Sequence, residues 1–428
     1  MKDRIMAAYL LSIFKLDRSI LRFVFAWATI GLIVVGINNV LINLYIVKLG
    51  FDLSYLGTLN GSMQVVWAIS AFPAGYIGAR FGLRNSLIAG FVIAALAFAC
   101  FLSVAWLPRD TWAAGLLLSN CATGVAAALL VVNSVPYLMA ITSEKDRNHA
   151  FTLMSALGAL AAFLGSLAAG ILPGVLMGLF ADRLNEAGAD NAVLWLAIPA
   201  FLGAALLLVK ARPEPSVIKE TTSVVREAAP IGTLVFLGIL FVLQLGSENA
   251  LGMFLNVYFA DNLQVSNSLI GTIFALARLL PFFLSPLLPF VLKRWGSGRT
   301  MTTGYLLITV CATLIAMIPS AAVAAAGSIL FSLAVNFNGT ARNLFGQESV
   351  QPRWRTAVTA VFTISMATSG SLVGFGAGSL IDAAGFRGIF LASAILGLLV
   401  MLLYGAHQRL RIKQAPSTQP EPEVVSNE

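Results

Sequence analysis

Residues 56–90 read LGTLNGSMQVVWAISAFPAGYIGARFGLRNSLIAG, and residues 270–304 read IGTIFALARLLPFFLSPLLPFVLKRWGSGRTMTTG. The two stretches align without gaps, although they lie in different halves of the chain. The matched pairs are Gly57 with Gly271, Arg80 with Arg294, Phe81 with Trp295, Gly82 with Gly296 and Gly90 with Gly304. A unit repeated in the same orientation predicts two similar halves with a cavity between them.

The composition of the chain indicates a membrane protein. Of its 428 residues, 58% are hydrophobic and 11% are charged, and the mean hydropathy is +0.87. Soluble domains carry roughly a quarter charged residues, and no soluble core would bury this much apolar surface. Lipid is therefore the solvent for much of the chain. Because the hydrocarbon layer is about 30 Å thick, each spanning helix needs about 20 apolar residues.

Twelve apolar runs are long enough to span a bilayer, and most of their connections are short. The stretch 210–229 divides them into an N-terminal half, residues 21–209, and a C-terminal half, residues 230–409. The predicted fold is an all-α membrane protein with twelve transmembrane helices in two parallel six-helix repeats. The predicted spans are 21–49, 54–79, 85–107, 111–141, 148–178, 191–209, 230–260, 266–292, 300–318, 320–346, 356–382 and 386–408.

Three polar segments lie outside the two halves. Residues 1–20 are predicted to form a cytoplasmic amphipathic segment at the membrane interface, with a cleaved signal peptide as the alternative. Residues 210–229 contain prolines and charged residues, and are predicted to be a solvated cytoplasmic linker. Residues 410–428 end in QPEPEVVSNE and are predicted to be a disordered cytoplasmic tail.

The distribution of basic residues predicts the orientation of the chain. The N-terminus and every second connection hold 22 of the 27 Lys and Arg residues, whereas the opposite connections hold four. Basic residues are retained on the cytoplasmic side, so both termini are predicted to be cytoplasmic. The net charge of +8 therefore reflects membrane topology, and no nucleic-acid partner is expected.

One loop carries a resemblance to a known family. The segment Gly75-Tyr-Ile-Gly-Ala-Arg-Phe-Gly-Leu-Arg84 resembles the G-x-x-x-D-R-x-G-x-R loop of the major facilitator superfamily, and the resemblance extends from about residue 20 to 410. It implies a transporter fold that opens to alternate sides of the inner membrane. Ala79 replaces the family's acidic residue, so the charge latch that closes the cytoplasmic side is incomplete. The cytoplasmic gate residues implied by the resemblance are Gly75, Gly78, Arg80, Gly82, Arg84 and Arg294.

Two ionisable residues lie deep inside predicted spans, Glu248 in span seven and Arg278 in span eight. Each is twelve residues from the outer end of its span, or about 18 Å deep at about 1.5 Å per residue. Such groups cost at least about 2.5–3.5 kcal/mol in lipid, so each requires a function or a partner. Glu248 is predicted to bind a coupling proton, with Arg278 as its counter-charge or as an anion contact. The alternative is a static buried ion pair.

Amide side chains gather in the spans that the resemblance places around the central cavity. An amide both donates and accepts hydrogen bonds, so a cluster of amides suits a polar ligand. The alternative for any one of them is interhelical hydrogen bonding, worth about 0.6 kcal/mol. The predicted substrate-binding residues are Asn39, Gln64, Asn133, Tyr137, Gln244, Glu248, Arg278 and Asn336.

The predicted function is secondary active transport of a small organic solute, with proton-coupled export slightly favoured over uptake. The chain has no Gly-rich phosphate loop, no catalytic elbow motif and no His-based metal motif, so neither an enzyme, a cofactor nor a metal site is expected. The expected partners are a small-molecule substrate and membrane lipid, and we expect a monomer. The alternatives are a non-transporting sensor or assembly protein and an uptake permease.

Overall fold

The computed structural model describes residues 17–180, 184–213, 230–351 and 354–414. These residues are helical almost throughout, and no strand occurs among them, so the prediction of an all-α protein is confirmed. Most of the predicted interfacial segment 1–20 lies outside the described residues, as do residues 214–229 of the linker and 415–428 of the tail. The last helix extends to Gln414.

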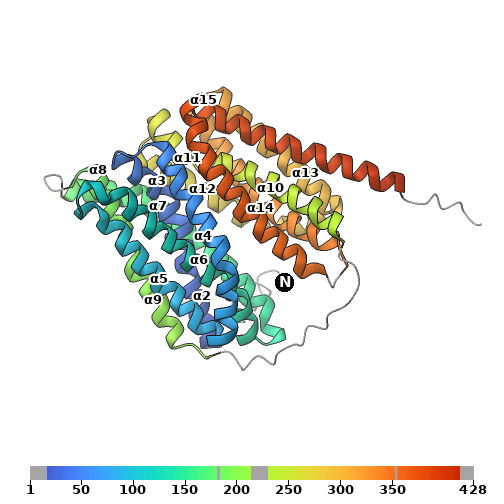
Figure 1. Cartoon of the computed structure of the whole chain (residues 1–428), viewed down its shortest axis with the longest axis horizontal. Helices are drawn as coiled ribbons and strands as arrows, with labels where there is room; N and C mark the ends of the chain where they lie inside the picture. The colour runs from blue at the N-terminus through green and yellow to red at the C-terminus, as the bar shows by residue number, and fades with distance from the viewer. Residues whose placement is uncertain (1–16, 181–183, 214–229, 352–353, 415–428) are drawn as a thin grey trace, which may run out of the picture.

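The N-terminal half forms one group of helices (Figure 1). Its first span joins two α-helical segments through a π-helix, in which the backbone is wider than in an α-helix. The helices of this half are α2 (Arg18–Ile30), the π-helix η1 (Gly31–Asn38), α3 (Asn39–Lys48), α4 (Leu53–Phe81), α5 (Leu83–Ser103), the short turns η2 (Val104–Trp106) and η3 (Arg109–Thr111), α6 (Trp112–Ile141), α7 (Glu144–Leu179), α8 (Glu186–Leu194) and α9 (Ala197–Val209).

The C-terminal half forms the second group. Its helices are α10 (Ile231–Gly252), α11 (Leu255–Val257), the π-helix η4 (Tyr258–Asn262), α12 (Asn267–Leu284), the turn η5 (Ser285–Leu287), α13 (Leu288–Met317), α14 (Ala321–Glu348) and α15 (Arg355–Gln414). Both α13 and α15 bend at a glycine with positive φ, Gly296 at 76° and Gly385 at 65°. Glycine adopts this backbone conformation without steric cost, whereas other residues are strained there.

Nine helices among the described residues are long and apolar enough to cross a membrane. Two of them, Asn267–Met317 and Ala357–His407, are 51 residues long, and each contains one of the two bends. The helix α4 has 29 residues and is less apolar, so it is not among the nine. The chain is thus a multi-pass helical membrane protein.

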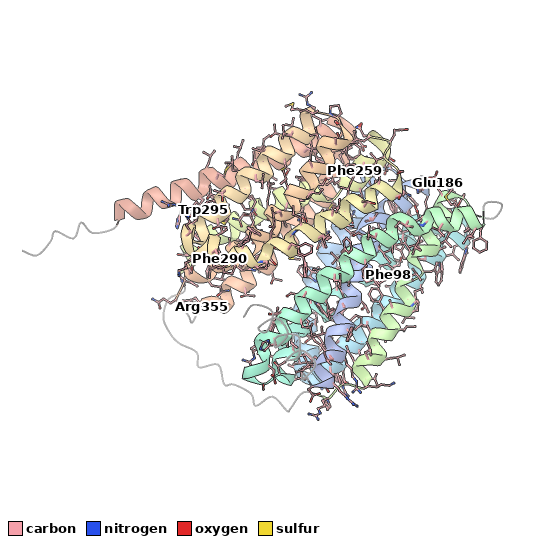
Figure 2. The ribbon with its side chains drawn as sticks, turned by 180° about the vertical axis from the view of Figure 1, so that it is seen from behind. Phe98, Glu186, Phe259, Phe290, Trp295 and Arg355 are labelled. Atoms are coloured by element: carbon pink, nitrogen blue, oxygen red, sulfur yellow. The ribbon has the colours of Figure 1, made fainter. Side chains whose placement is uncertain are left out.

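The two halves meet at one end and diverge at the other (Figure 1). At the meeting end, the Asn256 amide donates to the backbone oxygens of Asn39 and Val40 at 3.2 and 3.1 Å, and the Asn43 amide donates to Met253 O at 2.9 Å. Figure 2 shows Glu186 and Phe259 at this end, with Trp295 and Arg355 toward the opposite end of the C-terminal half.

Glycine contacts bring the two halves together in two places. A Cβ atom at Gly57 of α4 would collide with the backbone of Gly374 in α15. A Cβ atom at Gly271 of α12 would collide with the backbone of Gly170 in α7. Gly57 and Gly271 are matched positions of the repeat found in the sequence. Small residues permit this close helix packing, which is a common device in membrane proteins.

Candidate functional site

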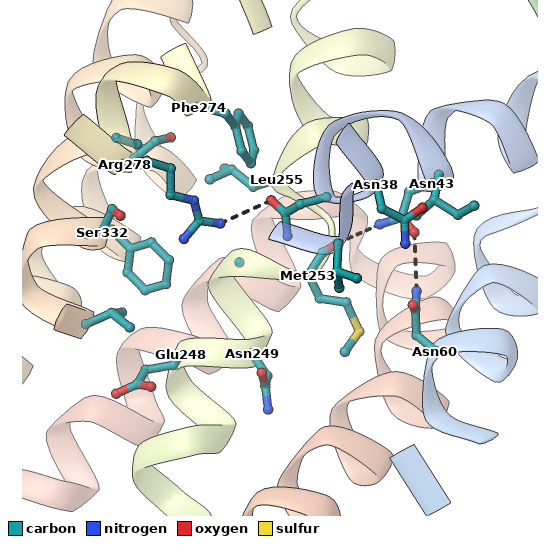
Figure 3. A pocket seen from close by; sticks show the side chains of 18 of the residues that line it. Asn38, Asn43, Asn60, Glu248, Asn249, Met253, Leu255, Phe274, Arg278 and Ser332 are labelled. Carbon is teal, nitrogen blue, oxygen red and sulfur yellow. Dashed lines mark hydrogen bonds between the residues drawn. The ribbon is translucent and has the colours of Figure 1, made fainter. Parts of the chain in front are cut away.

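A cavity of about 420 Å³ lies between the two halves, next to the end at which they meet (Figure 3). Helices of both halves form its walls: η1, α3 and α4 on one side, and α10, α12 and α14 on the other. Pockets of roughly 300–1,000 Å³ are typical of small-molecule sites. The lining residues are Val34, Asn38, Asn39, Ile42, Asn43, Asn60, Met63, Glu248, Asn249, Gly252, Met253, Leu255, Phe274, Ala277, Arg278, Ser328, Phe331, Ser332 and Val335.

The N-terminal wall is polar but carries no charge among its lining residues. It presents the amides of Asn38, Asn39, Asn43 and Asn60. Asn38 ends the π-helix and Asn39 begins α3, and π-helical bulges are frequent at functional sites. The Asn60 amide donates to Leu56 O at 3.1 Å, whereas Asn38 Oδ1 is buried and has no hydrogen-bond partner.

Arg278 of α12 supplies a positive charge to the opposite wall. Its Nη2 donates a long hydrogen bond of 3.4 Å to Asn39 Oδ1, across the boundary between the halves. Its Nε is buried, and none of the residues that the structure describes forms a hydrogen bond with it. Figure 3 shows the guanidinium reaching into the cavity, on the far side from Asn38 and Asn43. The described residues place no carboxylate within ion-pair distance of this arginine.

Glu248 pairs with a different arginine. Arg342 of α14 donates to Glu248 Oε1 at 2.9 Å, and the Tyr305 hydroxyl of α13 donates to the same oxygen at 2.6 Å. All three side chains are buried, and Glu248 also lines the cavity. The expectation of only two charges deep in the spans was therefore wrong. Arg342 was counted with the cytoplasmic basic residues because it lies near the end of its span, but a paired arginine side chain is stable inside the bundle.

Further buried polar side chains surround this pair in the C-terminal half. The Arg342 guanidinium lies 5.3 Å from the ring centroid of Phe362, close enough for a cation–π interaction. One helical turn before Glu248, the Gln244 amide donates to the Met301 sulfur at 2.8 Å. The amide of Asn338, one turn before Arg342, is buried without a hydrogen-bond partner. Four helices of the C-terminal half, α10, α13, α14 and α15, therefore meet at one set of polar contacts.

The comparison with known families rests on most of the chain. The sequence profile described as Major Facilitator Superfamily matches residues 23–375. The chain belongs to the Major Facilitator Superfamily. The resemblance inferred from the loop at Gly75–Arg84 is thus confirmed, and the family is one of transporters.

Solved structures of low sequence identity share the superfamily fold. The chain is similar to a mutant form of the nucleoside transporter NupG, with a TM-score of 0.73 and 13% identity, covering 91% of this chain and 99% of that one. A POT family transporter in complex with 5-aminolevulinic acid gives a TM-score of 0.70 and 14% identity, with coverage of 92% and 96%. A bacterial homolog of the human lysosomal transporter Spinster, inward-facing and occupied, gives 0.68 and 15%, with coverage of 92% and 96%. No curated protein sequence matches the chain.

The structure of this superfamily member brings three of the predicted binding residues to the cavity, namely Asn39, Glu248 and Arg278. The other five lie elsewhere. Asn133 donates to Ala74 O, Tyr137 donates to Arg212 O, Gln64 packs against Gly370, Gln244 contacts Met301, and Asn336 is exposed on α14. Asn38, Asn43 and Asn60 also line the cavity, although none of them is among the predicted binding residues. Asn38 and Asn43 belong to the amide cluster of the predicted spans, but no sequence signal distinguishes them from the amides that lie elsewhere.

The predicted gate residues of the superfamily loop lie at the diverging end. Gly82 has a φ of 98°, as its repeat partner Gly296 has a φ of 76°, so both halves turn sharply at this position. A Cβ at Gly78 would collide with the Asn133 amide. Arg84 donates to Ala211 O at 2.9 Å. The other three behave differently: Arg80 bonds the Tyr76 hydroxyl at 2.9 Å, Arg294 is exposed, and Gly75 has room beside Val132.

The same end of this superfamily fold holds an ion pair between Arg212 and Asp17 at 3.1 Å. The Asp17 carboxylate also accepts the backbone N–H of Ser19 at 2.7 Å and thereby caps α2. This hydrogen bond, assisted by the charge of Arg212, lowers the pKa of Asp17 below its ordinary value. The contacts of Arg212 tie the residues after α9 to the start of α2, next to Tyr137.

Proposed function

We propose that the chain is a secondary active transporter that moves a small organic solute by alternating access. The observation that carries this proposal is a cavity of about 420 Å³ that both halves line and that contains a buried acid, Glu248. In such transporters the two halves rock about a central site. The similar structures include proteins described as nucleoside and peptide transporters, which supports a small organic solute as the cargo.

The proposed topology has twelve spans in two parallel repeats. Dividing each 51-residue helix at its glycine bend and adding α4 to the nine apolar helices supports this count. The positive φ shared by Gly82 and Gly296 supports the repeat. The excess of basic residues at the diverging end supports an inward-facing state in the cell membrane, with both termini cytoplasmic.

Proton coupling is proposed to act through Glu248. Its carboxylate accepts hydrogen bonds from Arg342 and Tyr305, so a proton on Glu248 would remove the charge that holds Arg342 in place. Because Glu248 also borders the cavity, the occupancy of the cavity and the protonation of Glu248 are energetically linked. In a transporter with this linkage, the movement of the solute is coupled to the movement of a proton.

The test is flux into liposomes that contain the purified chain. Radiolabelled nucleosides, dipeptides and acylated amino acids are offered with and without an imposed pH gradient. We expect one solute class to accumulate on the gradient in the wild type. Glu248→Gln should still exchange that solute across the membrane, but its gradient-driven accumulation should fall to the level measured without a gradient. Glu186→Gln is the matched control, because Glu186 is an exposed acid at the first residue of α8, where it pairs with Lys48 at 3.4 Å outside the cavity.

Each outcome of the flux experiment decides a point. Accumulation by Glu248→Gln equal to wild type means that Glu248 has a static role in packing and does not couple protons. A complete lack of solute-dependent flux in the wild type favours a non-transporting sensor or assembly protein. The sign of the gradient that drives accumulation distinguishes export from uptake.

A further inference from the structure

The central cavity has a charge that the lining residues do not balance. Two charged side chains line it, Glu248 and Arg278. The Glu248 charge is matched by Arg342, which donates to it at 2.9 Å. Among the described residues, Arg278 has one long contact, to Asn39, and no acid lies within ion-pair distance of it. The cavity therefore retains one positive charge.

We infer that the solute is an organic monocarboxylate whose carboxylate binds Arg278 and whose body carries a hydrogen-bond donor toward Asn38. The inference rests on the proposed transport function and specifies its substrate class. A buried charge without a partner is costly, and a bound anion removes that cost. One arginine matches one negative charge, and the planar guanidinium suits a carboxylate through two parallel hydrogen bonds.

The opposite wall determines what the rest of the solute must offer. Asn38 also lines the cavity. The described residues offer no hydrogen-bond partner to its buried Oδ1, so a ligand N–H or O–H group would satisfy this oxygen if the amide turned toward the cavity. Figure 3 shows Arg278 and Asn38 on opposite sides of the same space. A solute that spans this space thus carries a negatively charged hydrogen-bond acceptor at one end and a neutral hydrogen-bond donor at the other.

Apolar side chains between these two ends favour an amphipathic body. Phe274, Phe331, Met63 and Met253 all line the cavity. Aromatic rings and flexible methionines accept apolar groups of varied shape. A dianionic phosphate would leave one negative charge unbalanced beside a single guanidinium, so the carboxylate is the better match.

The test is ligand-dependent thermal stabilisation of the purified full chain. The probes are N-acetyl-L-phenylalanine, which has a carboxylate, an amide N–H and a ring, its neutral carboxamide, and phenyl phosphate. We expect the carboxylate to raise the unfolding temperature and the carboxamide to have little effect, because a ligand stabilises the folded state according to its affinity. Arg278→Gln should weaken carboxylate binding at least about 30-fold, and Arg278→Lys should retain part of it.

Controls separate binding from folding. The unfolding temperature of each variant without ligand shows whether it folds, and Arg299→Gln removes an exposed cation of the same half. Equal stabilisation by acid and carboxamide overturns the inference, as does unchanged carboxylate binding by Arg278→Gln or tighter binding of phenyl phosphate. Arg278-dependent binding without flux in liposomes would instead leave the inference standing and contradict the transport proposal. If only neutral solutes are transported, and their flux is unchanged in Arg278→Gln, the transport proposal stands and the inference of a carboxylate substrate is contradicted.

Discussion

The two walls of the cavity are stabilised by different interactions: hydrogen bonds of neutral amides on the N-terminal side, and a buried ion pair on the C-terminal side. The N-terminal wall consists of uncharged amides, several of which bond to backbone carbonyls of the same or the facing half. The C-terminal half contains both charged lining residues and the buried pair of Glu248 with Arg342. The positions that match in sequence between the halves therefore do not carry the same chemistry at the site.

Two positions that match in the sequence alignment of the halves, Gln64 and Arg278, illustrate this difference. Gln64 of α4 occupies the position that corresponds to Arg278 of α12, yet Gln64 packs against Gly370 of α15 and does not line the cavity. Hydrogen bonds made by neutral amide side chains inside membranes are weak, worth about 0.6 kcal/mol, so they break and reform at low cost. Buried ion pairs break only at high cost. We expect the C-terminal half to be the more rigid of the two during transport.

Removal of Arg342 should lower the stability of the protein more than any other substitution considered, because it breaks the buried ion pair of the C-terminal half. Arg342→Leu leaves the Glu248 carboxylate buried with the Tyr305 hydroxyl as its remaining donor. Breaking a buried pair in this way costs about 3–5 kcal/mol. The measurement is the unfolding temperature in detergent, compared with Arg299→Leu at an exposed position.

The double variant Glu248→Gln with Arg342→Leu provides the control for charge. It removes the unpaired acid, so it should recover a substantial part of the lost stability. An Arg342→Leu protein as stable as the wild type would show that the pair contributes no rigidity to the C-terminal half.

The fold was more predictable from the sequence than the site was. The apolar runs and the glycine-rich loop are patterns within single segments, and they predict the helical membrane fold that the family match supports. Glu248 and Arg278 were recognised because charges in lipid are conspicuous. The partner of Glu248 was not, because pairing depends on how the helices pack: Arg342 lies 94 residues after Glu248 in sequence.

Amide side chains illustrate the same limit. Asn38 and Asn133 both lie in predicted spans, and sequence alone gives no reason to separate them. The structure seats Asn133 against Gly78, where its amide bonds to backbone oxygens, while Asn38 ends a π-helix at the cavity. The rotation of each helix about its axis and the presence of a π-helix determine which amide lines the cavity, and neither follows from residue type.

A smaller effect is expected from the glycine contacts that join the halves. Gly271→Ala places a Cβ against the backbone of Gly170, and overpacking of this kind costs about 1–3 kcal/mol. The variant should shift the protein away from the state in which this end is closed. Spin labels at the exposed positions Asp110 and Asn262, one in each half, should report a larger distance between the halves.

Gly174→Ala is the matched control for this prediction. A Cβ at Gly174 meets nothing within 4 Å, although the residue lies in the same helix as Gly170. Both substitutions raise helix propensity by a similar amount, so the difference between them isolates the contact. Identical distance distributions for the two variants would mean that the close approach of α7 and α12 does not control closure.

The smallest effect is expected from Asn38→Ala, which tests the neutral wall directly. Loss of a single amide contact in a membrane protein is worth about 0.6 kcal/mol, so affinity for the acylated amino acid should fall only about threefold. The measurement is the same thermal shift used for Arg278→Gln, with Asn343→Ala at an exposed position of α14 as the control. A loss as large as that of Arg278→Gln would mean that the amide wall carries as much of the binding as the charged wall does. The energetic asymmetry between the two halves would then be refuted, because solute recognition would be shared equally across the boundary that opens and closes.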